Sequence, residues 1–234
     1  MERSRDRHAI QELVERNGLL PVFHPEVIAA MELRIYTDRE IVCAIGDYLE
    51  GLQVLVKGRL KIHTSLPNGK TMLLRFTEPP TLIGDVEWMA RYPVGNTVEA
   101  VGATMLLFVS RECLLEKEMD NPAFLQFMIR NLSHKLFTNG QSTALNRLYP
   151  LENRFASYLL ALLPDQDPAS SGRARELRTS TLGEMAELLG TSYRHLNRVI
   201  ARLTQEGVVE RKRGGLRVLD ESRLRELAHN HRYI

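Results

Sequence analysis

The sequence predicts an α+β fold in which a β-rich region, a long helix and a small helical domain with a basic hairpin follow one another. Short apolar runs with turn residues between them occupy residues 40–110. Helical spacing of apolar residues continues through 121–148, and two short helices joined at a glycine precede a hairpin near the end. We therefore expect a β-rich domain over 1–120, a connecting helix over 121–149 and a second domain over 150–234.

The β-rich region begins with a helix over about 6–17, where Ile10, Leu13 and Val14 have helical spacing. The strands expected after it are EIVCAI (40–45), QVLVKG (53–58), RLKIHTSL (59–66), TMLLRF (71–76), NTVEAV (96–101) and TMLLFVS (104–110). The turn signals between them are Gly46-Asp47, Gly58, Asn68-Gly69 and Pro79-Pro80. Many short strands at near-regular spacing are typical of a β-sandwich or barrel.

A long helix is expected from Asn121-Pro122 to about Leu148, because Asn caps helices well and Pro suits the first helical position. Its apolar residues step by four, three and four positions, as in a coiled-coil seam. The seam residues are Leu125, Ile129, Leu132 and Leu136. They predict a dimerisation helix, and the alternative is a helix packed on its own domain.

The C-terminal region starts with an amphipathic helix over 151–163, followed by an exposed connection over 164–176 that is rich in Pro, Ser and Gly. Thr179 to Thr181 then offers capping hydroxyls. Leu182, Met185, Ala186 and Leu189 predict the inner face of a short helix that ends at Gly190. Ser192 can cap the next helix, expected over about 192–205. A small residue, a glycine turn and a capped second helix predict a helix-turn-helix.

The second helix of this motif, within TSYRHLNRVIARL (191–203), has two unlike faces. Leu196, Val199, Ile200 and Leu203 predict its buried stripe, whereas Arg194, His195, Arg198 and Arg202 lie on the other side. Such a face is either an ordinary solvated surface or one that enters a groove of double-stranded DNA. VVER and LRVLD then flank Lys212-Arg213-Gly214-Gly215, which predicts a hairpin with a basic tip, or wing. These parts in this order favour DNA binding.

The predicted DNA contacts follow from where a recognition helix enters the major groove, with its N-terminal residues first. We expect Tyr193, Arg194 and Arg198 to read bases, since the arginine fork matches two acceptors on guanine. Arg202, Lys212 and Arg213 are candidates for phosphate contacts, which add affinity and salt dependence. Ser192 and His195 belong to the same surface, although His195 has an alternative reading as an ordinary surface residue, and Tyr193 could instead pack against the helix edge.

Charge is distributed unevenly along the chain. The formal net charge is +2, but residues 173–234 carry 13 Lys and Arg against 8 Asp and Glu, and the remaining residues carry 18 against 21. A basic end on a mildly acidic body suits a nucleic-acid partner. No apolar run reaches the roughly 18 residues that cross a bilayer, and the charged N-terminus lacks a secretion signal, so we expect a cytoplasmic protein without membrane contact.

The whole chain resembles the Crp–Fnr family of bacterial transcription regulators. Its order of parts matches, and Gly46, Gly58, Gly69 and LIGDVEW (82–88) stand where that family has turn glycines and a nucleotide-pocket segment. GTSYRHLNRVIARL (190–203) falls on the recognition helix, and TSYRHL resembles the YeiL-type branch. The resemblance implies a β-roll of the cyclic-nucleotide-binding jelly-roll type, a dimerisation helix and a winged helix-turn-helix. It also implies a homodimer that binds a pseudo-palindromic operator and meets RNA polymerase.

The expected effector pocket departs from the family pattern. Members that bind cyclic AMP use a Gly-Glu pair and then an Arg-Ser pair, but this chain has Gly84-Asp85 and Val94-Gly95. Asn139 stands where the long helix would meet the base. Losing a charge-assisted bond to a buried phosphate costs on the order of several kcal/mol. We therefore expect that cyclic AMP is not the effector. The alternative is a cyclic-nucleotide-responsive regulator with a non-standard phosphate pocket, for which Arg91 is a possible substitute.

The sequence gives little support to other effectors or to an enzymatic function. No cysteine precedes Cys43, which argues against the N-terminal iron–sulfur centre of the oxygen-sensing branch. His63 and His134 are isolated candidates for haem, and Cys43 and Cys113 leave a redox signal open. We expect no cofactor, and the effector, if there is one, stays unidentified. An enzymatic jelly roll would need clustered His and Glu ligands, and no nucleophile elbow or phosphate-binding loop is present, so an enzyme is not expected.

Overall fold

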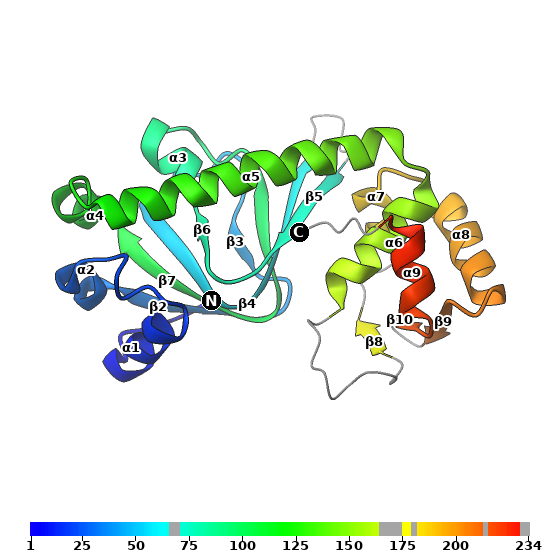
Figure 1. Ribbon diagram of the computed structural model, residues 1–234, viewed down its shortest axis with the longest axis horizontal. Coiled ribbons are helices and arrows are strands. Elements are labelled where there is room, and N and C mark those ends of the chain that lie inside the picture. Colours follow the sequence, from blue (N-terminus) through cyan, green and yellow to red (C-terminus); the bar gives the residue numbers. More distant parts are fainter. Residues whose placement is uncertain (66–70, 164–174, 179–181, 213–214, 230–234) are drawn as a thin grey trace. The chain divides into compact units, whose positions relative to one another are not determined.

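The computed structural model describes residues 1–65, 71–163, 175–178, 182–212 and 215–229 (Figure 1). The chain forms two compact units, one of residues 1–64 and 75–139 and the other of residues 65–74 and 140–234. Among the described residues, every helix is too short or too polar to span a bilayer.

The first unit begins with a short strand and two helices. Strand β1 (Glu2–Ser4) was not expected, and it pairs with β2 (Glu32–Tyr36). Helix α1 (Arg7–Arg16) confirms the prediction, because its N-cap Asp6 accepts hydrogen bonds from the backbone of His8 and Ala9 at 3.0 and 3.2 Å. Helix α2 (Pro25–Ala30) follows.

The strands of this unit form one antiparallel sheet. The elements after β2 are β3 (Ile41–Cys43), β4 (Gly51–Ser65), β5 (Thr71–Thr77), β6 (Thr81–Ile83), α3 (Asp85–Ala90), β7 (Thr97–Ser110) and α4 (Arg111–Lys117). In the described part of the chain the sheet has seven strands, in the order β1-β2-β7-β4-β5, with β3 paired to β7 and β6 paired to β4. This β-rich first domain confirms the predicted fold class.

The prediction of separate short strands on either side of Gly58 and of Gly102 was wrong. Each pair forms one long strand, β4 or β7, and the two strands pair with each other across a register shift between Lys57 and Arg59. Gly58 and Gly102 both have positive φ, at 88° and 71°. A glycine at a bulge has the same local signal as a glycine in a turn, so the sequence alone did not separate them. The predicted Asn68-Gly69 turn lies outside the described residues.

Helix α5 (Pro122–Leu148) confirms the predicted long helix. Asn121 caps it, since its side-chain oxygen accepts from the backbone of Ala123 at 3.0 Å. The Asn121 amide also donates to the fully buried carboxylate of Glu118, which in turn accepts from the backbone of His24 at 2.8 Å. One buried acidic group therefore joins the start of α5 to the end of α4 and the start of α2.

The first part of α5 completes the core of the first unit. Phe124 and Met128 pack in a buried cluster with Trp88 of α3, and the Trp88 and Phe124 rings meet edge to face. In Figure 1 this helix runs along the sheet, with α3 and α4 beside it. The pocket described below lies between the sheet, α3 and this helix.

The second unit is a small winged domain. Its elements are α6 (Leu151–Leu162), β8 (Arg175–Arg178), α7 (Leu182–Leu188), α8 (Tyr193–Gln205), β9 (Val209–Lys212), β10 (Gly215–Val218) and α9 (Glu221–Leu227). The strands form an antiparallel sheet in the order β8-β10-β9. The predicted loop over 164–176 was too long at its end, because residues 175 and 176 already belong to β8, where they pair with β10. The rest of that loop and the predicted caps at 179–181 lie outside the described residues.

Replacing Gly58 by Ala should destabilise the first unit more than replacing Gly46 by Ala. Both glycines have positive φ, so both substitutions carry a backbone strain of about 1–2 kcal/mol. Only at Gly58 would the new Cβ meet a neighbour, the Ala103 carbonyl oxygen at 2.6 Å, whereas nothing lies within 4 Å of Gly46. We expect the G58A variant to lose about 1–3 kcal/mol more than G46A.

Urea unfolding followed by the fluorescence of Trp88 measures this difference, because the chain has one tryptophan and it is buried in the first unit. Equal losses in the two variants would show that the strand bulge tolerates a side chain at residue 58.

Candidate effector pocket and nucleic-acid interface

The second helix of the helix-turn-helix is set by local features. Gly190 has φ of 61° and follows α7, and the Thr191 backbone donates to the Ala186 carbonyl at 2.8 Å, which closes the turn. The Ser192 hydroxyl accepts from the His195 backbone at 3.2 Å and caps α8 as expected. Arg154 of α6 also donates a hydrogen bond to the Leu189 carbonyl, which connects the turn to α6.

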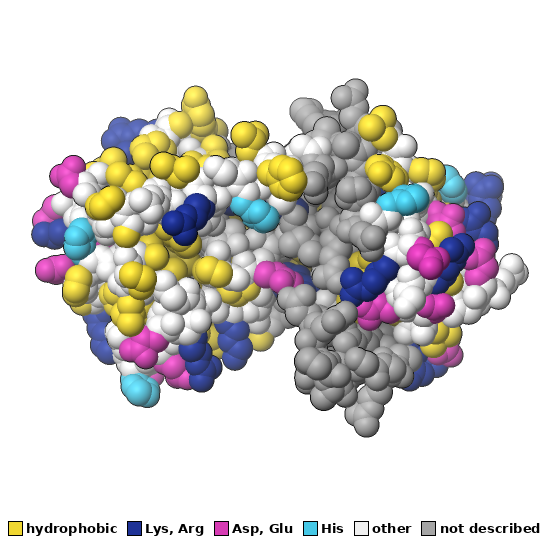
Figure 2. Space-filling view, viewed as in Figure 1, with side chains coloured by type: hydrophobic (Ala, Val, Ile, Leu, Met, Phe, Trp, Pro, Cys, Tyr) yellow, Lys and Arg dark blue, Asp and Glu magenta, His cyan; other side chains and the backbone are white. Residues whose placement is uncertain are grey.

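The two faces of α8 differ as the sequence predicts. Leu196, Val199, Ile200 and Leu203 are all buried. On the other side Tyr193 is 54% exposed, and Arg194 and Arg198 are exposed one turn apart. Neither arginine has an ion-pair partner among the described residues. Figure 2 shows Lys and Arg side chains gathered at the edge of this unit over α8. His195 is exposed too, with its ring nitrogen 3.4 Å from the Thr191 hydroxyl.

The residues expected to touch phosphates are not equally available. Arg202 forms ion pairs with Glu152 of α6 and, at 3.8 Å, with Glu206. Lys212 lies on the outer strand β9 and pairs with Glu210 at 2.7 Å. Arg213 lies outside the described residues. Arg202 therefore braces α8 against α6, and a phosphate would have to compete with two carboxylates for it.

Arg211 is a surface cation that the sequence reasoning missed. It is exposed on β9 and donates a hydrogen bond to the Asn197 side chain of α8. The contact joins the wing to the middle of the recognition helix. The sequence could have indicated this residue, because Arg211 directly precedes Lys212 and Arg213 and the three form one basic run.

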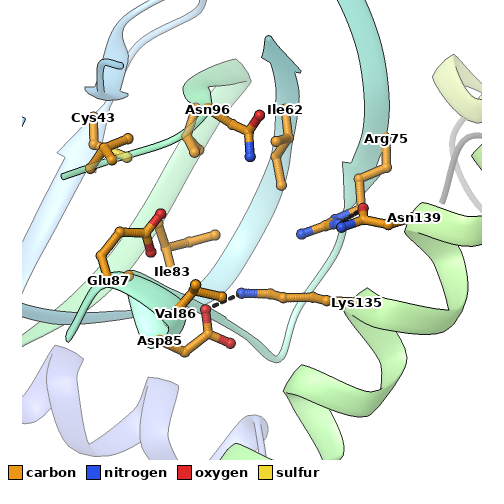
Figure 3. A pocket seen from close by; sticks show the side chains of 13 residues that line it. Cys43, Ile62, Arg75, Ile83, Asp85, Val86, Glu87, Asn96, Lys135 and Asn139 are labelled. Atoms are coloured by element: carbon orange, nitrogen blue, oxygen red, sulfur yellow. Dashed lines mark hydrogen bonds and ion pairs between the residues drawn. The ribbon is translucent and has the colours of Figure 1, made fainter. Parts of the chain in front are cut away.

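A cavity of about 100 Å³ lies in the first unit between the sheet, α3 and α5. Four of the five predicted pocket residues line it, namely Gly84, Asp85, Val94 and Asn139. Gly95 does not, because Val94 is the residue of that loop that turns inward, at 3% exposure. Figure 3 shows Arg75 and Lys135 extending into the cavity from one side, with Asn96, Glu87 and Cys43 placed across it.

Lys135 of α5 is a buried cation that the sequence reasoning missed. Its ammonium group donates to Asp85 at 2.5 Å and to the Leu82 carbonyl at 2.6 Å. Four residues earlier on the helix, Asn131 accepts from the Leu82 backbone nitrogen at 3.0 Å. Burial lowers the pKa of Lys135, and the Asp85 carboxylate opposes that shift. Helix α5 thus binds both backbone groups of Leu82 and the carboxylate of Asp85 at the start of α3.

Arg75 of β5 is the second buried cation of the cavity, 7% exposed. It donates to the side-chain oxygen of Asn139 on α5. Burial lowers the pKa of its guanidinium, and the more distant Asp85 carboxylate only partly opposes this. Arg75 has no carboxylate within ion-pair distance among the described residues.

Arg91, the substitute considered for the missing phosphate arginine, lies elsewhere. It follows α3 with φ of 55° and lines a different hollow of about 440 Å³, together with Tyr48, Trp88 and Tyr92. Val94 is fixed by its backbone, which exchanges hydrogen bonds with Asp47 and Gly46, both at 2.8 Å. The side of the cavity next to Val94 therefore has no cation from the described residues.

The two cysteines are both free thiols. Cys43 is buried beside the cavity, and burial raises the pKa of its thiol to about 12. Cys113 is half-buried on α4, and burial raises the pKa of its thiol as well. At neutral pH both are protonated and poor nucleophiles, which gives no support to a redox signal.

The predicted seam on α5 divides between two environments. Ile129 and Leu136 are 61% and 78% exposed, whereas Leu125 and Leu132 are half-buried and pack partly against the core of their own unit. Phe137, which was not in the predicted seam, is 65% exposed. Figure 2 shows hydrophobic side chains along this part of the helix. An apolar strip of this kind on a long helix calls for a covering partner.

Two family models match the chain in the order of its units. The cyclic nucleotide-binding domain matches residues 33–121, and the Crp-like helix-turn-helix domain matches residues 153–227. Together they cover more than half of the sequence. The chain belongs to the Crp–Fnr family. It is accordingly a Crp-like transcription regulator with a helix-turn-helix DNA-binding domain, and the family consists of regulators and not of enzymes.

Individual relatives agree with this assignment. The regulatory protein YeiL of Escherichia coli O157:H7 is 26% identical over 88% of this chain and 90% of its own length. A CRP-like cAMP-activated global transcriptional regulator of Mycobacterium tuberculosis is 22% identical over 92% and 98%. Among solved structures, the c-di-GMP-responsive global regulator CLP of Xanthomonas campestris has a TM-score of 0.69 at 20% identity, over 82% of this chain and 95% of that one. The match to the solved structure shows the fold alone, and the names of these proteins refer to two different signals, cAMP and c-di-GMP.

Replacing Asp85 by Asn should destabilise this Crp–Fnr protein strongly. Asp85 and Lys135 are 1% and 11% exposed at their side chains, so the substitution leaves a buried ammonium group without its counter-ion, next to Arg75. We expect a loss of about 3–5 kcal/mol, with much of it recovered in the double variant D85N/K135M. Urea unfolding followed by Trp88 fluorescence measures both.

The control is Glu12→Gln, which breaks the exposed pair with Arg16 and should change stability by less than about 1 kcal/mol. A D85N variant as stable as this control would mean that Lys135 is neutral or solvated in the native protein.

Proposed function

We propose that this protein is a homodimeric, sequence-specific transcription regulator that inserts α8 into the major groove of a pseudo-palindromic operator. The observation that carries the proposal is the outer face of α8, where Arg194 and Arg198 are exposed one turn apart and have no ion-pair partner among the described residues. Opposite charges three or four residues apart on a solvated helix face stabilise the helix, and neither arginine has such a partner among the described residues. Unpaired arginines on a capped helix that follows a glycine turn favour a base-reading role.

The proposed contacts fall into two groups. Tyr193, Arg194 and Arg198 read bases, because they lie on the N-terminal half of α8. The proposed phosphate contacts come from the edges of α8 and from the wing, and they are Ser192, His195, Arg202, Arg211, Lys212 and Arg213. Arg202 ranks below the others, since it already pairs with Glu152 and Glu206.

The proposed dimer forms through α5. Ile129 and Leu136 face outward with Phe137, and Leu125 and Leu132 border this strip. Two copies related by a two-fold axis would place their recognition helices about 34 Å apart, one turn of DNA, which matches inverted half-sites. As in the family it belongs to, we propose that the bound dimer meets RNA polymerase.

Cyclic AMP is not the proposed effector. Val94 replaces the arginine expected on the phosphate, and the cavity of about 100 Å³ is well below the roughly 300 Å³ at which ligand pockets for drug-sized molecules begin. The two cations of the cavity, Arg75 and Lys135, enter from β5 and α5 and not from the loop that carries Val94. They are the residues on which a non-standard cyclic-nucleotide pocket would have to rely.

Replacing Arg198 by Ala should weaken operator binding by about 1–3 kcal/mol and relax the sequence preference at one position of each half-site. The measurement is fluorescence anisotropy on an operator selected from random DNA, at several salt concentrations. The matched control is Arg16→Ala, which removes one exposed cation from the first unit and should change nothing.

In the same assay Lys212→Ala should weaken binding to all sequences alike and lower the salt dependence by about one counter-ion. Cyclic AMP should leave the affinity of the unmodified protein unchanged. Operator binding that is unaffected by R198A would remove Arg198 from the base readers, and binding that requires cyclic AMP would contradict the proposed independence.

Replacing Leu136 by Glu should separate the dimer, because the new carboxylate would be buried against the partner helix. The matched control is Leu20→Glu, an exposed leucine that does not belong to α5. Sedimentation velocity should show a monomer for L136E and a dimer for L20E, and operator binding should fall together with dimerisation. A dimeric L136E protein would place the interface somewhere other than on α5.

A further inference from the structure

Arg75 is a buried cation that lacks a counter-ion within the described residues, although it lines a cavity. Its neighbour in the cavity, Lys135, is neutralised by Asp85 at 2.5 Å, whereas the partner of Arg75 among the described residues is the neutral amide of Asn139. Buried charges in proteins are normally paired, because the cost of removing them from water is otherwise not recovered. An anion that enters the cavity would supply the missing partner.

A second group in the cavity is also incomplete. Asp85 is 1% exposed, and its Oδ1 accepts from Lys135, but its Oδ2 has no hydrogen-bond partner among the described residues. A buried carboxylate oxygen calls for a donor. The cavity is thus lined by a guanidinium from β5 whose partner is a neutral amide, and by a carboxylate at the start of α3 that has one buried oxygen without a donor.

The charge of the lining limits what can bind. The charged side chains that line the cavity are Arg75, Lys135, Asp85 and Glu87. Because Asp85 already balances Lys135, and Glu87 stands across the cavity, a ligand with several negative charges would meet two carboxylates. A single carboxylate matches the fork of one guanidinium in two parallel hydrogen bonds.

The size of the cavity limits the ligand further. The cavity volume of about 100 Å³ is about a third of the roughly 300 Å³ at which pockets for drug-sized ligands begin. A molecule of a few carbon atoms suits a space of this size better than a nucleotide does.

We propose that the cavity binds a small hydroxy acid or amino acid, whose carboxylate pairs with Arg75 and whose hydroxyl or amino group donates to the Asp85 carboxylate. This assignment rests on the proposed function, in which the same cavity is the effector pocket. The ligand would lie between β5, α3 and the polar side of α5 that carries Lys135 and Asn139. Its binding would therefore act on the proposed dimerisation helix directly.

The test is isothermal titration of the full-length protein with four small probes that differ by one group. Lactate and serine carry both a carboxylate and a donor, propionate lacks the donor, and lactamide lacks the charge. We expect lactate or serine to bind, propionate to bind about tenfold more weakly, and lactamide not to bind. A tenfold change in Kd corresponds to about 1.4 kcal/mol.

Three variants assign the binding to Arg75. Arg75→Gln keeps a donor for Asn139 but removes the charge, and should weaken binding of the carboxylate probes at least about tenfold. Arg75→Lys keeps the charge and should retain part of the affinity. Arg91→Gln, the control, removes a cation that lines the other hollow and should leave binding unchanged. Trp88 fluorescence and the unfolding midpoint show whether each variant is folded, and R75K supports the assignment even if R75Q does not fold.

The proposal is overturned if neither lactate nor serine binds, or if R75Q binds them as well as the unmodified protein does. Operator binding is measured separately without any probe. Loss of probe binding with intact operator binding would remove the ligand assignment alone, whereas a protein that binds the probes but no DNA would overturn the proposed function alone.

Discussion

The docking of the first part of α5 against the sheet and α3 is the constraint on which the pocket and the proposed dimer surface both depend. Asn131, Lys135 and Asn139 stand four residues apart, so they form one polar stripe along the helix. The side chains of this stripe form hydrogen bonds with both backbone groups of Leu82, with the carboxylate of Asp85 and with the guanidinium of Arg75. This fixes the rotation of α5 about its own axis. Ile129, Leu136 and Phe137 therefore remain outside, and the proposed dimer surface follows from how the pocket is built.

The pocket keeps cationic side chains although Val94 stands where the family has an arginine. Val94 leaves one side of the cavity apolar, yet Arg75 and Lys135 bring two cations from β5 and α5. Lys135 is neutralised by Asp85, and burial lowers the pKa of both cations, so each is held at a cost that a partner must offset. Asp85 partners Lys135 within the chain. For Arg75 the described residues supply only a neutral amide. This difference between the two cations is the reason to expect a ligand with a carboxylate.

The features that the sequence predicted correctly are those that depend on residues close together in the chain. The stripe on α8, the Ser192 cap, the Gly190 turn and the start of α5 at Asn121 depend on residues a few positions apart, and the structure has them as expected. Arg75 and Lys135 were missed because each lies in a pattern that hides it. Arg75 interrupts an apolar strand as a solvent-facing residue would, and Lys135 sits in a helix with many polar residues. Only the long-range approach of β5, α3 and α5 makes them pocket residues.

Ion pairs within the protein divide the arginines of α8 into those that can read DNA bases and one that positions the helix. Arg202 is held by Glu152 of α6, so its guanidinium contributes to the placement of α8 on its own domain before any DNA is bound. Arg194 and Arg198 have no such partner among the described residues, so a guanine can take both donors of their forks without breaking an ion pair. Arg211 adds a third role, because its hydrogen bond to Asn197 ties the wing to the same helix. These arginines have the same formal charge, but they are not equally available to DNA. The specificity for DNA sequence should therefore come mainly from the first two turns of α8.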